Sequence, residues 1–141
     1  MRKKSRKVLV ALYILIILWI TLFSRTPGTV RIFRSLFWEI EMGYWNNIIQ
    51  NILLFIPLGF LIGGKRGIIA GVLLSIGIEL SQYIFRLGYC ELDDVLNNTI
   101  GTAIGALLYK KFGKRIERII KKRRTDSFFT GVMKSVGKPK H

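Results

Sequence analysis

The sequence predicts an all-α, polytopic membrane helix bundle of about four transmembrane helices, with an interfacial helix outside and a basic amphipathic tail. Half of the 141 residues are hydrophobic, yet the formal net charge is +15. The Lys and Arg residues flank long apolar runs instead of being spread along the chain. A membrane protein combines these features readily, because apolar runs lie in lipid and charges gather at helix ends. We therefore expect lipid, and not nucleic acid, to be the partner of the basic residues.

Composition also limits the chemistry that a site in this chain can use. The single cysteine, Cys90, excludes an internal disulfide and a Cys-rich zinc site. The single histidine, His141, lies far from the apolar segments, which excludes His-based metal sites and a Ser-His triad in the membrane. We expect neither a cofactor nor a resident metal.

The N-terminal third predicts one span and one surface helix. Residues 8–23 form an apolar run after a basic start and lack a small-x-small cleavage pattern, so we expect an uncleaved helix. In residues 30–47, apolar positions recur at helical spacing between charged ones, which predicts an amphipathic helix in the outer interface. Trp38, Tyr44 and Trp45 are expected to anchor it at the depth of the lipid headgroups.

Three further apolar segments predict the remaining spans. They cover residues 48–63, 68–85 and 94–109, the last extending to Phe112, with a tight basic turn at residues 63–67. Three small-xxx-small pairs favour close helix packing: Gly59 and Gly63, Gly67 and Gly71, Gly101 and Gly105. We divide the chain into a transmembrane domain, residues 1–110, and a basic cytoplasmic tail, residues 111–141, expected to lie on anionic lipid of the inner leaflet.

The distribution of basic residues predicts the orientation. Of the 23 Lys and Arg residues, 19 fall on one side of a four-span arrangement: five at the start, two in the turn and twelve from Lys110 onward. The positive-inside rule then places both termini in the cytoplasm.

Polar residues within the apolar segments are the candidate functional residues. Glu79, Gln82 and Arg86 fall at i, i+3 and i+7 and so share one helix face, with Arg86 a possible partner for Glu79. An ionisable residue inside a span costs at least ~2.5 kcal/mol at its centre, which makes it a functional hypothesis by default. A buried polar contact that holds helices together is the alternative, and the sequence favours neither.

A second polar group follows in the next segment. Asp93 and Asp94 can cap a helix start, and one aspartate is explained in that way. Two aspartates with Glu91 and with Asn97 and Asn98 in the next turn exceed what capping needs. Together with Asn51 in the second span, three helices are expected to present polar groups at similar depth near the outer interface, which predicts a recognition or catalytic pocket.

At these residues the chain resembles the VanZ-like family of bacterial membrane proteins. The matching segments are residues 51–60 (NILLFIPLGF), 78–82 (IELSQ) and 91–101 (ELDDVLNNTIG), followed by Gly105. The resemblance covers roughly residues 8–110 and implies a link to resistance against teicoplanin and related lipoglycopeptides in Gram-positive bacteria. The residues that it implies for function are Asn51, Glu79, Gln82, Asp93, Asp94, Asn98 and Gly101.

Three functions follow as hypotheses. In the first, an outer-leaflet pocket made of Asn51, Glu79, Gln82, Arg86, Asp93, Asp94, Asn97 and Asn98 binds a lipoglycopeptide or a cell-wall lipid headgroup. In the second, an enzyme modifies a lipid-linked envelope precursor, with Glu79 as general acid or base and with Asp93 and Asp94 able to hold a divalent cation. In the third, the protein is a structural adaptor whose polar residues only pack the bundle. The sequence leaves the oligomeric state open.

Overall fold

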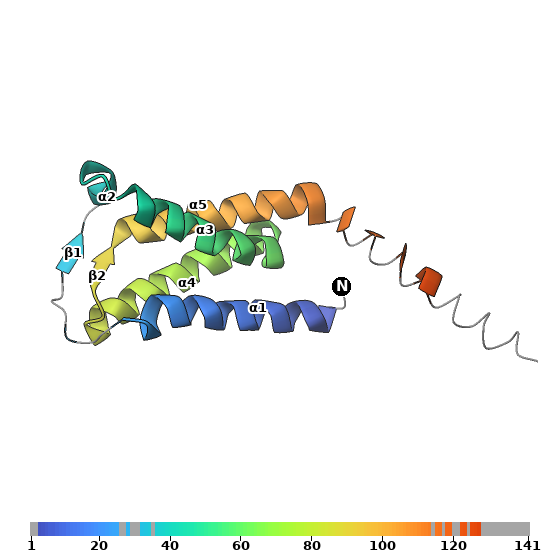
Figure 1. Ribbon diagram of the computed structural model, residues 1–141, viewed down its shortest axis with the longest axis horizontal. Helices are drawn as coiled ribbons and strands as arrows, with labels where there is room; N and C mark the ends of the chain where they lie inside the picture. Colours follow the sequence, from blue (N-terminus) through green and yellow to red (C-terminus); the bar gives the residue numbers. More distant parts are fainter. Residues whose placement is uncertain are drawn as a thin grey trace, which may run out of the picture.

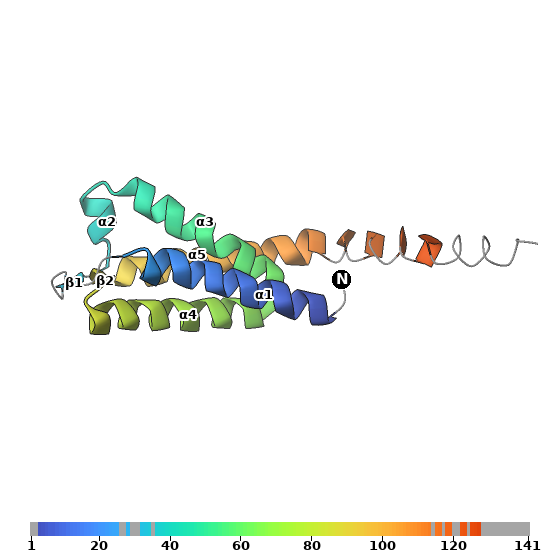
Figure 2. The ribbon, with the colours of Figure 1, turned by 60° about the horizontal axis from the view of Figure 1, so that its bottom comes forward.

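The computed structural model describes residues 3–25, 28, 32–34 and 36–113, and then residues 115–116, 118–119, 122–123 and 125–127. Four long helices lie side by side in both ribbon views (Figure 1, Figure 2), and two short strands and one helical turn gather at one end of them. The elements are α1 (Lys3–Leu18), η1 (Trp19–Phe23), β1 (Ile32–Arg34), α2 (Trp38–Glu41), α3 (Trp45–Ile62), α4 (Gly64–Phe85), β2 (Tyr89–Glu91), α5 (Leu92–Leu108) and η2 (Tyr109–Gly113).

The predicted membrane helix bundle is confirmed. Among the residues that the structure describes, three segments are long and apolar enough to cross a bilayer: residues 4–23, residues 45–62 and residues 64–85. The fourth helix, α5, has 17 residues and continues as the π-helix η2 to Gly113. Whether α5 crosses the bilayer stays a prediction, since 17 residues lie at the short end of what spans ~30 Å of hydrocarbon.

The interior of the bundle holds polar side chains beside a small apolar core around Phe55, while its exterior is apolar. Buried residues include Ser75, Gln82 and Thr102, each at most 1% exposed. Large apolar side chains such as Leu73 and Leu107, each 65% exposed, cover the exterior instead. A water-soluble bundle would reverse this distribution, because exposed apolar surface is costly in water and neutral in lipid.

Close backbone contact holds α3 against α5, the most extensive helix pair in the bundle. A Cβ atom at Gly101 or Gly105 would fall on the carbonyl oxygen of Ile52 or Ile56, respectively. The predicted packing role of this glycine pair is therefore confirmed. Gly63 is also closely packed, since a Cβ there would meet the Tyr109 ring, and it ends α3 as a turn residue with a φ of 71°.

The expected interfacial helix over residues 30–47 is wrong. Part of this segment forms β1, which pairs in parallel with β2 in the register Arg34 to Glu91. Only one helical turn, α2, follows, since Phe37 has a left-handed φ of 68° and α3 already begins at Trp45. The backbone groups of β1 find partners 57 residues away, and periodicity within the segment cannot reveal such a pairing.

The turn between α3 and α4 is tighter than expected. Gly63 alone separates the two helices, so Lys65 lies in the first turn of α4. Arg6 of α1 closes this end of the bundle by donating to the carbonyl oxygens of Leu61 at 2.5 Å and Ile62 at 2.7 Å. These are carbonyls of the last turn of α3, which lack partners within the helix.

Candidate functional site

A polar pocket of about 420 Å³ opens at the end of the bundle that carries α2, β1 and β2. It collects side chains from five elements and from the segment after η1, and it mixes amides, aromatic rings, carboxylates and two arginines. Its lining residues are Arg25, Arg34, Trp38, Tyr44, Asn47, Gln50, Asn51, Tyr89, Glu91 and Asp94. Of the predicted site residues, Asn51 and Asp94 line this pocket.

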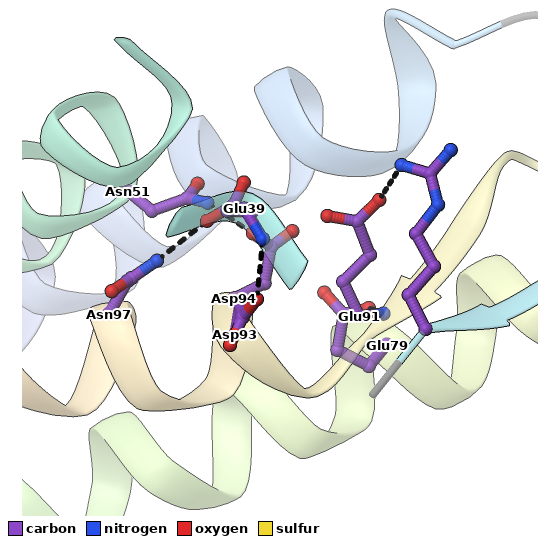
Figure 3. A network of polar contacts seen from close by, with 8 residues as sticks. Glu39, Asn51, Glu79, Glu91, Asp93, Asp94 and Asn97 are labelled. Atoms are coloured by element: carbon purple, nitrogen blue, oxygen red, sulfur yellow. Dashed lines mark hydrogen bonds and ion pairs between the residues drawn. The ribbon is translucent and has the colours of Figure 1, made fainter. Parts of the chain in front are cut away.

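Arg34 on β1 is the most constrained cation of the pocket. Its guanidinium group lies 3.5 Å from the ring centroid of Trp38 and 3.5 Å from that of Tyr89, so the two rings enclose it. Its Nη1 donates to Glu91 Oε1 at 2.7 Å, the contact that Figure 3 marks beside β2. Stacking and ion pairing together fix the planar guanidinium in one orientation.

Two amides fix two carboxylates beside this ion pair (Figure 3). Asn51 of α3 donates its side-chain N–H to Asp94 Oδ1 of α5. Asn97, one turn further along α5, donates to Glu39 Oε2 of α2 at 2.9 Å. The structure thus brings together Asn51, Asp94 and Asn97, which the sequence placed at similar depth, and adds Glu39 from the misassigned segment.

Asp93 has a role different from the capping role that the sequence offered as the simple explanation. Its two carboxylate oxygens accept the backbone N–H groups of Phe37 at 2.6 Å and Glu39 at 2.9 Å. Asp93 therefore holds the start of α2, while the residue before α5, Glu91, makes no side-chain cap of its own helix. Asp93 is 5% exposed and does not line the polar pocket.

The partner that the structure gives Glu79 is not the one that the sequence suggested. Glu79 Oε2 accepts the backbone N–H of Glu91 at 2.9 Å, which ties α4 to β2. Arg86 is exposed and ends α4 in a left-handed conformation with φ 55°. The Glu79 side chain is buried and does not line the pocket, so it supports the pocket through its contact with β2.

Two further predicted residues connect helices inside the bundle. Gln82 donates to the carbonyl oxygen of Thr21 at 3.1 Å, and Asn98 donates to Ser75 Oγ at 2.8 Å. Both side chains are at most 3% exposed. For these two residues the geometry fits the alternative that polar side chains pack the bundle.

Glu39 and Cys90 lie outside the long helices, and the surroundings of each residue raise its pKa. Burial raises the pKa of Glu39 to about 7, and the neighbouring Asp94, Glu91 and Asp93 add to the rise while the Asn47 amide opposes it. Burial, followed by the nearby Glu79, raises the pKa of the Cys90 thiol. Cys90 is therefore a small buried thiol and not an activated nucleophile.

Sequence reasoning missed the pocket residues Arg25, Arg34 and Tyr89 and the neighbouring Glu39. Glu39 and Arg34 looked like the polar face of an interfacial helix, which is the ordinary place for such residues. A signal was present in Glu39, because an acid between Trp38 and Ile40 in an apolar interface is costly without a partner. Its partner Asn97 lies 58 residues away and could not be inferred from spacing.

A helix bundle with an apolar exterior, membrane-length apolar helices, buried polar side chains and a polar pocket at one end defines an integral membrane protein. The model of the VanZ/LLP1 family matches residues 10–115, so the chain belongs to this family. A relative from Enterococcus faecium, Protein VanZ, is 28% identical over 78% of this chain and 76% of its own length. No solved structure matches the chain.

Proposed function

We propose that the protein lowers susceptibility to teicoplanin-type lipoglycopeptides by binding an amphiphile, drug or cell-wall lipid, at the outer leaflet. Membership of the VanZ family supports a role related to teicoplanin resistance. Teicoplanin-type drugs carry an acyl chain and act at the membrane surface. A site for such a molecule needs a polar part and an apolar part side by side.

The observation that carries this proposal is the position of Arg25. Arg25 lines the polar pocket and also lines a separate apolar groove of about 580 Å³, formed by Leu22, Phe23, Phe85 and Leu87. Gly88 leaves room for the guanidinium, since a Cβ there would meet Arg25 Nη1 at 2.7 Å. A polar head in the pocket and an acyl chain in the groove would meet at this residue.

Four bilayer crossings with the pocket outside are part of the proposal. Lys65 and Arg66 begin α4 at the end opposite the pocket, and Arg6 contacts the same end. The start of α1 and the end of α5 also lie there (Figure 1). The positive-inside rule favours that end as the cytoplasmic one.

The test compares two glycopeptides in a sensitive Gram-positive host that expresses the wild type. We expect a severalfold rise in the inhibitory concentration of teicoplanin, and little change for a matched glycopeptide without the acyl chain. Equal protection against both drugs would contradict a role for the apolar groove. An absence of protection against teicoplanin would contradict the proposed function.

A groove variant sharpens the test. Leu87→Trp narrows the apolar groove and should abolish protection at unchanged membrane abundance. Leu107→Trp is the matched control, because Leu107 is 65% exposed on α5 and lies outside the groove. Binding of teicoplanin or of a cell-wall lipid precursor to the purified wild type then identifies which amphiphile occupies the site.

A further inference from the structure

Three carboxylates from three elements converge beside the polar pocket. One carboxylate oxygen from each of Glu39 on α2, Glu91 on β2 and Asp94 on α5 lies within 4.8 Å of the other two. Figure 3 shows Glu91 and Asp94 pointing toward one another, with Glu39 above Asp94. We call these three residues the carboxylate cluster.

Each carboxylate of the cluster is held in place through one of its oxygens. Asn97 binds Glu39 Oε2, Arg34 binds Glu91 Oε1, and Asn51 binds Asp94 Oδ1. Such outer contacts orient the acidic ligands of metal sites, because they fix each carboxylate while leaving its second oxygen directed elsewhere.

The second carboxylate oxygen of Glu39 provides evidence for a bound ligand. Glu39 is 1% exposed, and its Oε1 atom has no hydrogen-bond partner among the described residues. Leaving a buried acceptor unsatisfied costs about 1–3 kcal/mol, and more for a charged group. The hydrogen bond from Asn97 satisfies Oε2 and leaves the buried Oε1 without a partner in the described part of the chain. A cation bound at Oε1 would satisfy it.

The charges at this end of the bundle also favour a bound cation. Glu79 and Asp93 lie next to the cluster, so five carboxyl groups share the region. The basic residues that line the pocket are Arg25 and Arg34. If all five carboxyl groups ionise, they and the two pocket arginines together carry a formal charge of −3, which a divalent cation would reduce.

We propose that Glu39, Glu91 and Asp94 bind a hard divalent cation of the Ca²⁺ type, with pocket water completing its coordination. An all-oxygen ligand set suits Ca²⁺, Mg²⁺ or Mn²⁺ and not zinc. Oxygens on opposite sides of Ca²⁺ lie about 4.6–5.2 Å apart, so a single ion of this size can reach three oxygens that lie within 4.8 Å of one another. This site differs from the Asp93–Asp94 pair suggested by the sequence, since Asp93 is engaged by α2.

The test uses the full-length protein purified in detergent and stripped with EGTA. Tb³⁺, a luminescent substitute for Ca²⁺, should be sensitised by Trp38 and Tyr44, which line the adjoining pocket. We expect Ca²⁺ to displace Tb³⁺ and to raise the unfolding temperature, with a dissociation constant near the ~0.1–1 mM of open extracellular Ca²⁺ sites. No Tb³⁺ signal, together with no thermal shift in about 10 mM Ca²⁺, Mg²⁺ or Mn²⁺, would overturn the proposal.

Glu39→Gln separates a metal ligand from a structural residue. As a ligand, its loss should remove the Ca²⁺ response while leaving stability in EGTA equal or higher, because the carboxylates repel one another less. A structural residue would instead lower stability equally with and without Ca²⁺. Glu41→Gln is the control, since Glu41 is an exposed acid on the same helix and should keep the full response.

Asp94→Asn serves as the second variant if Glu39→Gln does not fold. Loss of the Tb³⁺ signal in Asp94→Asn supports the site, and full retention places the ion elsewhere and overturns the proposal. The result does not depend on drug resistance, because these measurements use purified protein and no antibiotic.

Discussion

The carboxylate of Glu79 on α4 accepts the backbone N–H of Glu91 on β2 at 2.9 Å, in a place where neither residue is more than 8% exposed. This contact fixes the strand that carries Glu91 into the polar pocket. An acid within a membrane helix thus acts first as an anchor for the outer end of the bundle.

Glu79 therefore contributes to stability through an acceptor and not through its charge. Glu79→Gln keeps an oxygen for the Glu91 N–H and should leave thermal stability in detergent nearly unchanged. Glu79→Leu leaves that buried N–H unsatisfied and should cost about 1–3 kcal/mol. Equal unfolding temperatures of the Leu and Gln variants would contradict the anchoring role.

Asp93 should control the order of α2. Asp93→Ala removes the acceptor for the N–H groups of Phe37 and Glu39, a loss comparable to that of a helix cap, about 0.5–2 kcal/mol. We expect faster amide hydrogen exchange in residues 37–41 and unchanged exchange in α4. Glu41→Ala is the matched control on α2, and if it accelerates exchange equally, the effect does not come from Asp93.

The α3–α5 contact should be intolerant of any added side chain. In Gly101→Ala the new Cβ meets the Ile52 carbonyl, and the helices must separate at a cost of at least about 1–3 kcal/mol. Gly77→Ala is the control, because no atom lies within 4 Å of its added Cβ, and alanine favours the helix by up to about 1 kcal/mol. Thermal unfolding of both variants in detergent measures the difference, and equal stabilities would contradict close packing at Gly101.

Local patterns were sufficient to predict the long helices but not the short elements of residues 30–47. The apolar runs that became α1, α3 and α4 are long enough to cross a bilayer, and burial in lipid makes such runs helical whatever their neighbours are. Asn51 and Asp94 were identified for the same reason, since polar side chains are conspicuous in apolar segments.

The remainder of the site depends on contacts between distant parts of the chain. Arg34 lies beside Glu91 only because β1 pairs with β2, and Glu39 is buried only because Asp93 holds α2 over α5. Read locally, Arg34 and Glu39 belong to an exposed polar helix face. The neighbouring Asn97 and Asn98 also have different roles, because Asn97 binds Glu39 on α2 whereas Asn98 binds Ser75 on α4. This difference follows from the packing of α2 and α4 on α5.

The measurement that tests the account most directly is the teicoplanin susceptibility of cells expressing Arg34→Gln at a membrane abundance equal to that of the wild type. Arg34 lies between Trp38 and Tyr89 in the polar pocket, and its loss removes a fixed charge worth at least ~1.4 kcal/mol of binding, or about tenfold. We predict that Arg34→Gln loses most of the protection, whereas Arg115→Gln, at an exposed position beyond η2, keeps it. Full protection by Arg34→Gln at equal abundance would contradict a function for the polar pocket.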